Sequence, residues 1–141
     1  MKKETFKKVF SVVLCTAFAS ALFPSVVAFA GNVADTPFFY DIDYQQSADT
    51  MQRPKLDATS SYILCSSNTG TATAQSNGIQ MGTVYTWGPE YPVGIGYQYL
   101  TNWVWENRPQ TNVAAYCFFS FHNKTNYRAI HTEGLWSPDS V

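Results

Sequence analysis

Two carboxylates, two residues apart, are the first candidate for chemistry in this chain. Asp41 and Asp43 alternate with apolar residues in 38–44, so both side chains project from one face of a predicted strand. Paired carboxylates can hydrolyse glycosides, and carboxylate oxygens can also bind calcium. The alternative is a solvated outer face, on which charge prevents edge-to-edge pairing. The aspartates between 35 and 49 do not follow the spacing of a calcium loop, so we expect the solvated face.

No motif for a nucleophile accompanies these carboxylates. Ser120 and His122 share one face of a predicted strand, but the sequence lacks the Gly-x-Ser-x-Gly motif that exposes a serine. Cys117 beside His122 or His131 would need a reactive thiolate. The cysteines and histidines also lack the C-x-x-C and H-x-x-x-H spacings of metal sites. We therefore expect a non-enzymatic protein with no catalytic residue, no metal and no cofactor, and a small hydrolase using Asp41 and Asp43 is the alternative.

Aromatic side chains supply the candidate binding site. Rings flanked by Asn, Gln and Thr can stack on sugar rings, as they do on nucleic-acid bases. The candidate ligand-binding residues are Trp87, Tyr91, Trp103 and Trp105. Core packing is the role that we expect for most of the aromatic side chains, because Leu and Ile are few and aromatic rings must then supply much of the buried area. Tyr91 lies among prolines and glycines, so it is the ring that we expect to find exposed on a loop.

Alternation of apolar and polar residues predicts the strands that must position these side chains. A period of two, or a short apolar run between turn residues, is typical of a strand. Such segments occur at 38–44, 60–66, 79–87, 97–106, 113–122 and 127–135. The segment 60–66 is apolar on both faces, which is typical of a central strand. The segment 97–106 could also form a helix, but its aromatic and β-branched content favours a strand.

The segments between these strands are rich in turn residues. Ser, Asn, Thr, Pro and Gly dominate 47–59, 67–78 and 88–96, which we predict to be loops or turns. No amphipathic helix and no internal repeat is evident. The predicted fold class is all-β, an antiparallel β-sandwich or small open barrel of about six strands.

The first 30 residues predict a secretory signal peptide. Lysines precede an apolar run at 9–27, and Ala28-Phe29-Ala30 has the small residues of a cleavage site. A retained membrane anchor is one alternative, but Pro24 interrupts the apolar run and the cleavage site follows it. Lipidation at Cys15 is another, but the small residues that precede a lipidated cysteine are missing. We expect cleavage after Ala30, a secreted extracellular protein, and a single β domain over 31–141.

Cleavage at this site changes the charge and the cysteine count. The 9 basic and 10 acidic residues of the chain fall to 5 and 9, because four lysines and one glutamate leave, so the net charge becomes −4. The remaining cations are scattered, which argues against nucleic acid as a partner and against a stable membrane anchor. Cys65 and Cys117 remain, and two cysteines in an exported domain predict a disulfide. The alternative is two buried free thiols.

Short motifs at both ends of the predicted domain resemble a known family. They are Asp35-Thr36-Pro37-Phe38 after the signal and the closing Gly134-x-Trp136-Ser137-Pro138-Asp139-Ser140. In this layout the chain resembles small secreted proteins of Gram-positive bacteria that carry a domain of unknown function. In size and export alone it is also similar to bacteriocins of the lactococcin 972 type, which implies a small β-sandwich acting on neighbouring cells.

These observations lead to a functional hypothesis with two alternatives. The leading one is a secreted, non-enzymatic β-sandwich with an extracellular partner, acting as a bacteriocin-like effector. The first alternative is a module that binds a glycan or another cell-surface component through exposed aromatic rings, and the second is the small hydrolase. Growth inhibition, retention on polysaccharides and activity of aspartate variants would distinguish the three.

Overall fold

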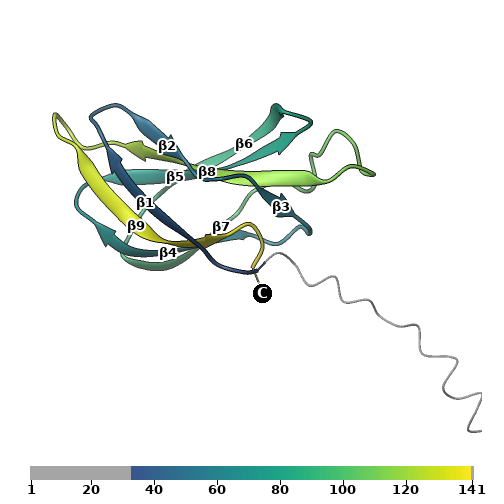
Figure 1. The fold of residues 1–141 in the computed structure, drawn as a ribbon, viewed down its shortest axis with the longest axis horizontal. Coiled ribbons are helices and arrows are strands. Elements are labelled where there is room, and N and C mark those ends of the chain that lie inside the picture. The colour runs from purple at the N-terminus through teal and green to yellow at the C-terminus, as the bar shows by residue number, and fades with distance from the viewer. Residues whose placement is uncertain (1–32, 141) are drawn as a thin grey trace, which may run out of the picture.

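Two antiparallel β-sheets packed face to face form the protein (Figure 1). The structure is a computed structural model and describes residues 33–140. The predicted signal peptide, residues 1–30, lies outside the described residues. Over the described part of the chain there are nine strands, and no helix is long and apolar enough to cross a membrane.

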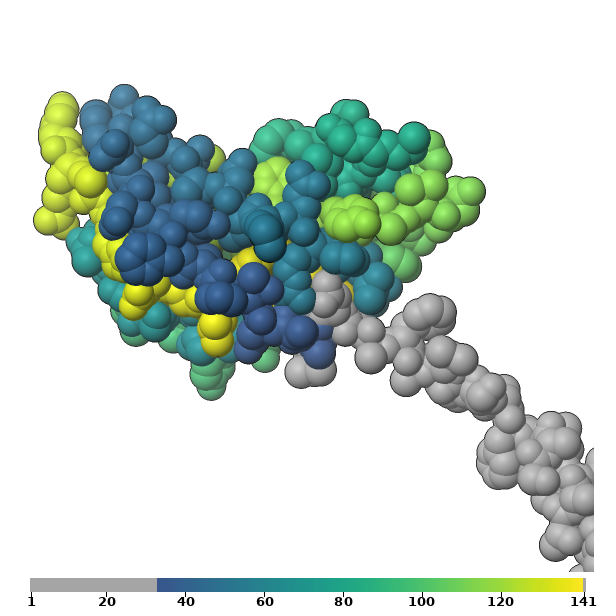
Figure 2. Space-filling model, in the orientation of Figure 1, coloured from purple at the N-terminus to yellow at the C-terminus, as the bar shows by residue number. Residues whose placement is uncertain are grey.

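Sheet A contains four strands in the order β1–β9–β4–β7. Their bounds are β1 Thr36–Ile42, β9 Ile130–Ser137, β4 Ser61–Asn68 and β7 Gly96–Leu100. Strand β4 lies between β9 and β7, and its register with β9 shifts at a bulge between Cys65 and Ser67. The strands from the two ends of the described chain therefore pair with each other, and the space-filling view shows the blue and yellow segments side by side (Figure 2).

Sheet B contains the other five strands, with β2–β8–β5–β6 in order and β3 also paired with β8. Their bounds are β2 Ser47–Asp49, β8 Ala115–Asn123, β5 Ala72–Gln80, β6 Thr83–Pro92 and β3 Arg53–Lys55. The short strands β2 and β3 pair with successive parts of β8, so together they form one interrupted edge. Thr50 lies between them, and its hydroxyl accepts a hydrogen bond from the Phe119 amide at 2.9 Å. This contact continues the ladder across the interruption.

The predicted antiparallel β-sandwich is confirmed, but it has nine strands where we expected about six. Two of the additional strands are β2 and β3, in the segment 47–59 that was predicted to be a loop. The third arises because 79–87 is a hairpin and not one strand. Met81 and Gly82 have φ of 52° and 78°, as a two-residue turn with positive φ at both positions requires.

Strand β5 covers most of 67–78, the second segment that its composition wrongly predicted to be a loop. Its residues are small and polar, which disfavours a strand by local propensity. However, β5 is central in sheet B and pairs with β6 on one side and β8 on the other. Ladders on both sides satisfy its backbone groups, and this tertiary effect overrides the weak local preference.

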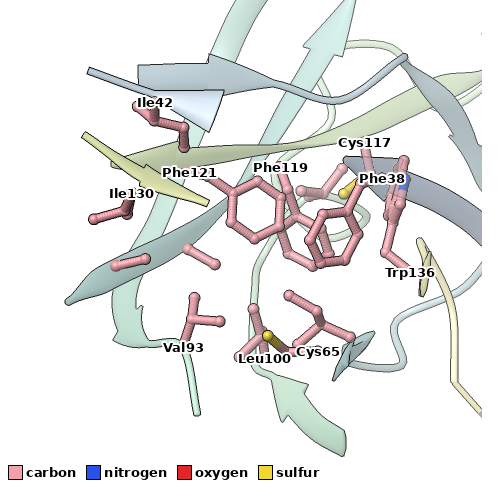
Figure 3. Packing of buried hydrophobic residues seen from close by; sticks show 14 residues of the cluster. Phe38, Ile42, Cys65, Val93, Leu100, Cys117, Phe119, Phe121, Ile130 and Trp136 are labelled. Carbon is pink, nitrogen blue, oxygen red and sulfur yellow. The ribbon is translucent and has the colours of Figure 1, made fainter. Parts of the chain in front are cut away.

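Aromatic side chains dominate the core between the sheets (Figure 3). Phe38 stacks on Phe121 with ring centroids 4.6 Å apart, and Phe119 meets Trp136 edge-on at 5.2 Å. Phe119, Phe121 and Trp136 are each 0% exposed. Aromatic rings supply much of the buried area here, as the scarcity of Leu and Ile implied.

The predicted disulfide is absent, because Cys65 and Cys117 are both free, buried thiols. They lie on different sheets and have different partners (Figure 3). Cys65 donates to the carbonyl of Ser67 at 3.2 Å, whereas the sulfur of Cys117 lies 3.1 Å from the Ser76 hydroxyl. Burial raises the pKa of both thiols, which favours the protonated form. The alternative of two thiols acting as small core residues is the one observed.

A buried ion pair connects the C-terminal segment to sheet B. Lys55 Nζ lies 2.8 Å from Asp139 Oδ1, and both side chains are 0% exposed. The same ammonium donates to the carbonyls of Pro138, at 2.7 Å, and of Thr59. The other carboxylate oxygen of Asp139 accepts the Leu56 amide at 3.2 Å. Hydrogen bonds of this kind are what a buried charge pair needs to be tolerated.

Candidate binding face on sheet A

The outward side of β4 is apolar although the described chain does not bury it. Ile63 and Cys65 point into the core and are 0% and 1% exposed. Tyr62 and Leu64 alternate with them, so they project from the outer surface of sheet A, where both are only half-buried. A central strand that is apolar on both sides normally lies between two covering layers. Here one layer comes from sheet B, and the described residues supply no second one.

The neighbouring strands extend this apolar surface across the whole sheet. In register, Leu64 lies opposite Leu135 of β9 and Tyr97 of β7, and Leu135 lies opposite Pro37 of β1. Directly opposed residues on one side of a sheet have Cβ atoms about 5 Å apart, so these four side chains form a continuous row. We name the outer surface of sheet A the aromatic face and define it by Pro37, Phe39, Tyr62, Leu64, Tyr97, Tyr99 and Leu135.

Three rings of the aromatic face are strongly exposed. The exposed fractions are 71% for Tyr97, 65% for Phe39 and 56% for Tyr99. Tyr99 lies opposite Tyr62 in the register, and their ring centroids are 5.7 Å apart with a 52° tilt. Single exposed apolar side chains are normal, but a contiguous group is typical of an interaction site.

Two hollows lie on the aromatic face. A groove of about 450 Å³ is lined by Phe39, Leu64 and Leu135 together with Ser66 and Glu133. A second hollow, of about 320 Å³, is lined by Tyr62 and Tyr99 with Asp35, Ser137 and Ser140. The apolar row therefore lines the first hollow, and the Tyr62–Tyr99 pair lines the second.

Charge on the outer surface of sheet A is concentrated beside Phe39. His131 Nδ1 lies 2.9 Å from Asp41 Oδ1, and Nε2 lies 3.4 Å from Glu133 Oε2. The hydrogen bond to Asp41, with that to Glu133, raises the pKa of His131 and so favours the imidazolium. Phe39 packs edge-on against this ring at 4.5 Å. The charges pair with one another, which leaves the row of Leu64, Leu135 and Tyr97 neutral.

Tyrosine hydroxyls give the aromatic face a polar component. Burial, with Asp35 nearby, raises the pKa of Tyr62, so this hydroxyl stays protonated at neutral pH. A phenol of this kind can donate and accept hydrogen bonds at the edge of a stacking surface. The face can therefore combine ring stacking with hydrogen bonding to a polyhydroxylated ligand.

Comparison with known proteins gives one match. The family DUF2712, described as a protein of unknown function, matches residues 26–140. The chain belongs to the DUF2712 family. No curated protein and no solved structure matches the chain. The expected resemblance to a family with a domain of unknown function is thus confirmed, and membership of DUF2712 by itself assigns no activity.

In this DUF2712 protein two of the four predicted ligand-binding aromatics lie on β6 and two lie in the loop after β7. Trp87 lies on β6, is 59% exposed and pairs in register with Asn77 on sheet B. Trp103 and Trp105 lie in the loop that follows β7. Trp103 is 47% exposed, whereas the guanidinium carbon of Arg108 lies 3.7 Å from the centroid of the Trp105 ring and covers it. No described ring contact joins any two of the four predicted aromatics.

The prediction that Tyr91 is exposed on a loop is wrong. Tyr91 belongs to β6, which continues to Pro92 through the segment predicted to turn. It pairs with Ala74 and packs against the core, and its hydroxyl lies 3.4 Å from the Thr101 carbonyl oxygen. Strand β6 is an edge strand, where prolines are tolerated because one row of amides has no ladder partner.

The structure separates the two candidate carboxylates. Asp41 lies on β1 and pairs with His131, whereas Asp43 lies beyond the end of β1, in a turn whose Gln46 amide donates to the Asp43 backbone carbonyl. On β8, Ser120 accepts a hydrogen bond from buried Asn77 at 3.0 Å. Within residues 33–140, no group of three or more His, Cys, Asp or Glu side chains is arranged to hold a metal ion.

Sequence reasoning did not single out Tyr62, Tyr97 and Tyr99 as candidates for binding. The available signal was the apolar pattern of 60–66 on both faces, which we interpreted as complete burial. A second signal was the shared parity of Tyr97 and Tyr99 in a segment next to a turn. Only the strand order reveals that these side chains meet on a surface that sheet B does not cover.

Proposed function

We propose that this protein is exported and acts, without catalysis, as a binding module for a neutral polysaccharide at the cell surface. The observation that carries the proposal is the aromatic face, with Tyr97 and Tyr99 exposed beside an apolar row on a sheet without a second covering layer in the described chain. Stacking of sugar rings on tyrosine would bury this apolar surface, and sugar hydroxyls would bond at its rim.

The dimensions of the aromatic face favour an extended polymer over a stable protein partner. Four strands cover three interstrand spacings, or about 15 Å. A typical specific protein interface needs about 800 Å² from each partner. A narrow apolar row with exposed rings beside it fits one polysaccharide strand better than an interface of that size.

Charge supports a neutral ligand. The seven residues that define the aromatic face are uncharged, and the charges at its end, on Asp41, His131 and Glu133, pair with one another. A polyanion such as nucleic acid needs several uncompensated cations. The predicted secreted domain has a net charge of −4, which also disfavours a polyanionic ligand.

Co-sedimentation with insoluble polymers tests the proposal. The purified protein is mixed with an insoluble polymer that lacks acetamido groups, namely cellulose, xylan or mannan, and the fraction that sediments is measured. We expect at least one polymer to retain the protein and the Tyr97→Ala/Tyr99→Ala variant to remain in solution. Trp87→Ala, which removes an equally exposed ring from sheet B, is the matched control and should sediment as the parent does. Failure of every polymer to retain the parent protein would contradict the proposal, as would equal retention of the double variant.

The resemblance to secreted Gram-positive proteins and to lactococcin 972-type bacteriocins supports a further possible role as an effector. This role rests on size and export alone and uses no residue of the aromatic face. Inhibition of related bacteria by the purified protein tests it independently, and absence of inhibition at micromolar concentration would count against it.

A further inference from the structure

A second cleft lies at the end of the sandwich opposite the described termini. It has a volume of about 360 Å³ and is formed by the turn after β1 and by the end of β8 with the turn that follows it (Figure 1). We name it the turn cleft and define it by its lining residues, Tyr44, Gln45, Gln46, His122, Asn123, Lys124 and Asn126. None of these residues belongs to the aromatic face.

Asn123 fixes the shape of the turn cleft. Its side chain is buried and its amide nitrogen donates to the carbonyls of Ile42, at 2.9 Å, and Arg128, at 2.8 Å. Its side-chain oxygen accepts the Thr125 amide at 2.8 Å, and its backbone amide donates to Gln46 at 3.1 Å. One side chain thus joins both turns, so the walls of the cleft are preorganised before any ligand binds.

Exposed amide side chains line the turn cleft. Gln45, Gln46 and Asn126 are all exposed, and among residues 33–140 their side-chain amides make no hydrogen bond to the protein. Each amide offers donors and an acceptor to a ligand. Beside them, the rings of Tyr44 and Tyr127 lie 5.2 Å apart, and Tyr127 is 86% exposed. The cleft thus offers amide groups and an apolar ring surface in one place.

The charge of the turn cleft is already compensated. Lys124 Nζ lies 3.0 Å from Glu90 Oε2, and His122 Nε2 lies 4.0 Å from Glu90 Oε1. The hydrogen bond from Lys124 lowers the pKa of Glu90, so the carboxylate is ionised at neutral pH and balances the lysine. Among the residues that line the cleft, a phosphate or carboxylate ligand would find no cation without Glu90 beside it. The lining favours an uncharged ligand that forms hydrogen bonds.

From this combination we infer that the turn cleft binds a neutral sugar that carries an acetamido group. The acetamido N–H and C=O match the acceptor and donors of a side-chain amide, and its methyl group can pack against a tyrosine ring. The site differs from the aromatic face in position and in chemistry, because it recognises polar groups of a terminal or short sugar and not a row of rings. It therefore goes beyond the proposed function and does not depend on it.

An NMR titration of the ¹⁵N-labelled protein with N,N′-diacetylchitobiose tests this inference. Saturable shifts are expected for the side-chain amides of Gln45, Gln46 and Asn126. Cellobiose, which lacks the acetamido group, should bind at least about fivefold more weakly. The absence of shifts up to about 10 mM would overturn the inference, as would equal affinity for cellobiose or shifts confined to the aromatic face.

Two variants connect the binding to this cleft. Gln46→Ala/Asn126→Ala removes two of the amides and should abolish the saturable shift of the remaining Gln45 side-chain amide. Tyr127→Gly removes the exposed ring, and glycine tolerates the positive φ of 60° at this position, so the fold should persist while affinity falls. Unchanged affinity in the two variants would overturn the inference. Tyr97→Ala/Tyr99→Ala should bind chitobiose as the parent does, which separates failure of this inference from failure of the proposed function.

Discussion

The outer surfaces of the two sheets differ in whether their side chains have partners within the protein. On sheet B, outward polar groups bond to the protein itself. Asn77 donates to Ser120 at 3.0 Å, and Gln75 donates to the Gly88 carbonyl at 2.7 Å. On sheet A, the row around Leu64 is apolar and its neighbours Tyr97 and Tyr99 are exposed. On sheet B these two amide nitrogens have partners within the fold, although Trp87 stays exposed, whereas the apolar row of sheet A has no covering layer in the described chain.

This difference predicts that the stability of the fold and the binding of a ligand depend on different surfaces. Truncation on sheet B should weaken the fold because it leaves buried polar groups without partners. Truncation of exposed rings on sheet A should leave the fold nearly intact and reduce binding. The predictions below test this separation, beginning with the largest expected effect.

The buried pair of Lys55 and Asp139 should dominate the stability of both sheets. Asp139→Asn removes the charge that compensates Lys55, and we expect the free energy of unfolding to fall by about 3–5 kcal/mol. Chemical denaturation monitored by fluorescence measures this loss. Because the pair connects the C-terminal segment after β9 to β3, the two sheets should unfold in one transition. Two separate transitions in the parent protein would show that the sheets are independent units.

Replacement of both charges is the control for this prediction. Lys55→Met/Asp139→Leu removes the pair without leaving a lone buried charge, so it should cost less than Asp139→Asn alone. A larger cost for the double variant would mean that the hydrogen bonds of the two groups, and not charge compensation, dominate.

Asn77 tests the outer side of sheet B. The residue is 0% exposed, and Asn77→Ala would leave the Ser120 hydroxyl without its donor. We expect a loss of about 1–3 kcal/mol in the free energy of unfolding, with retention on polysaccharide unchanged. Thermal denaturation and co-sedimentation measure the two quantities. A variant of full stability that no longer sediments would reverse the roles assigned to the two surfaces.

The exposed ion pair of Glu90 and Lys124 should matter little for stability. Glu90→Gln is expected to change the free energy of unfolding by less than about 1 kcal/mol, because both side chains are partly solvated and salt screens them. Chemical denaturation at low and high salt concentration measures this change in the free energy of unfolding. A loss of unfolding free energy well above about 1 kcal/mol that does not depend on salt would show that Glu90 has a structural role beyond the ion pair.

The smallest effect concerns the charged end of the aromatic face. The hydrogen bond with Asp41, together with that to Glu133, raises the pKa of His131. A raised folded pKa means that the imidazolium contributes its full stability below the unfolded pKa, and this contribution is lost as the pH rises through the folded pKa. NMR titration should show a pKa above the ordinary value, and Asp41→Asn should lower it. An unchanged pKa in that variant would show that the contact does not persist in solution.

Sequence patterns predicted the architecture better than the surfaces. Alternation located β1, β4, β8 and β9 well enough to predict an antiparallel sandwich, because half-buried strands need a period of two. It failed at β5, whose polar residues are held by ladders on both sides, and at the Met81-Gly82 turn, which lies inside an apparently continuous alternation.

The binding site was harder to predict because it depends on strand order. Trp87 and Trp103 are exposed, although core packing was the expectation for most of these rings, and neither belongs to the aromatic face. Tyr62 and Tyr99 are 37 positions apart in the sequence and meet only because β4 pairs with β7. The prediction of a disulfide failed for the same reason. An extracellular compartment favours oxidation of cysteines, but it does not specify which strands bring two cysteines together.

Mapping of the bound polysaccharide by NMR tests the central claim most directly. The ¹⁵N-labelled protein is titrated with soluble fragments of the polymer that retains it, and amide shifts are assigned along both sheets. The account predicts that shifts concentrate at 62–64 on β4 and 97–99 on β7, with few on β5 and β6. Shifts concentrated around Trp87 on β6, with β4 and β7 unaffected, would contradict it.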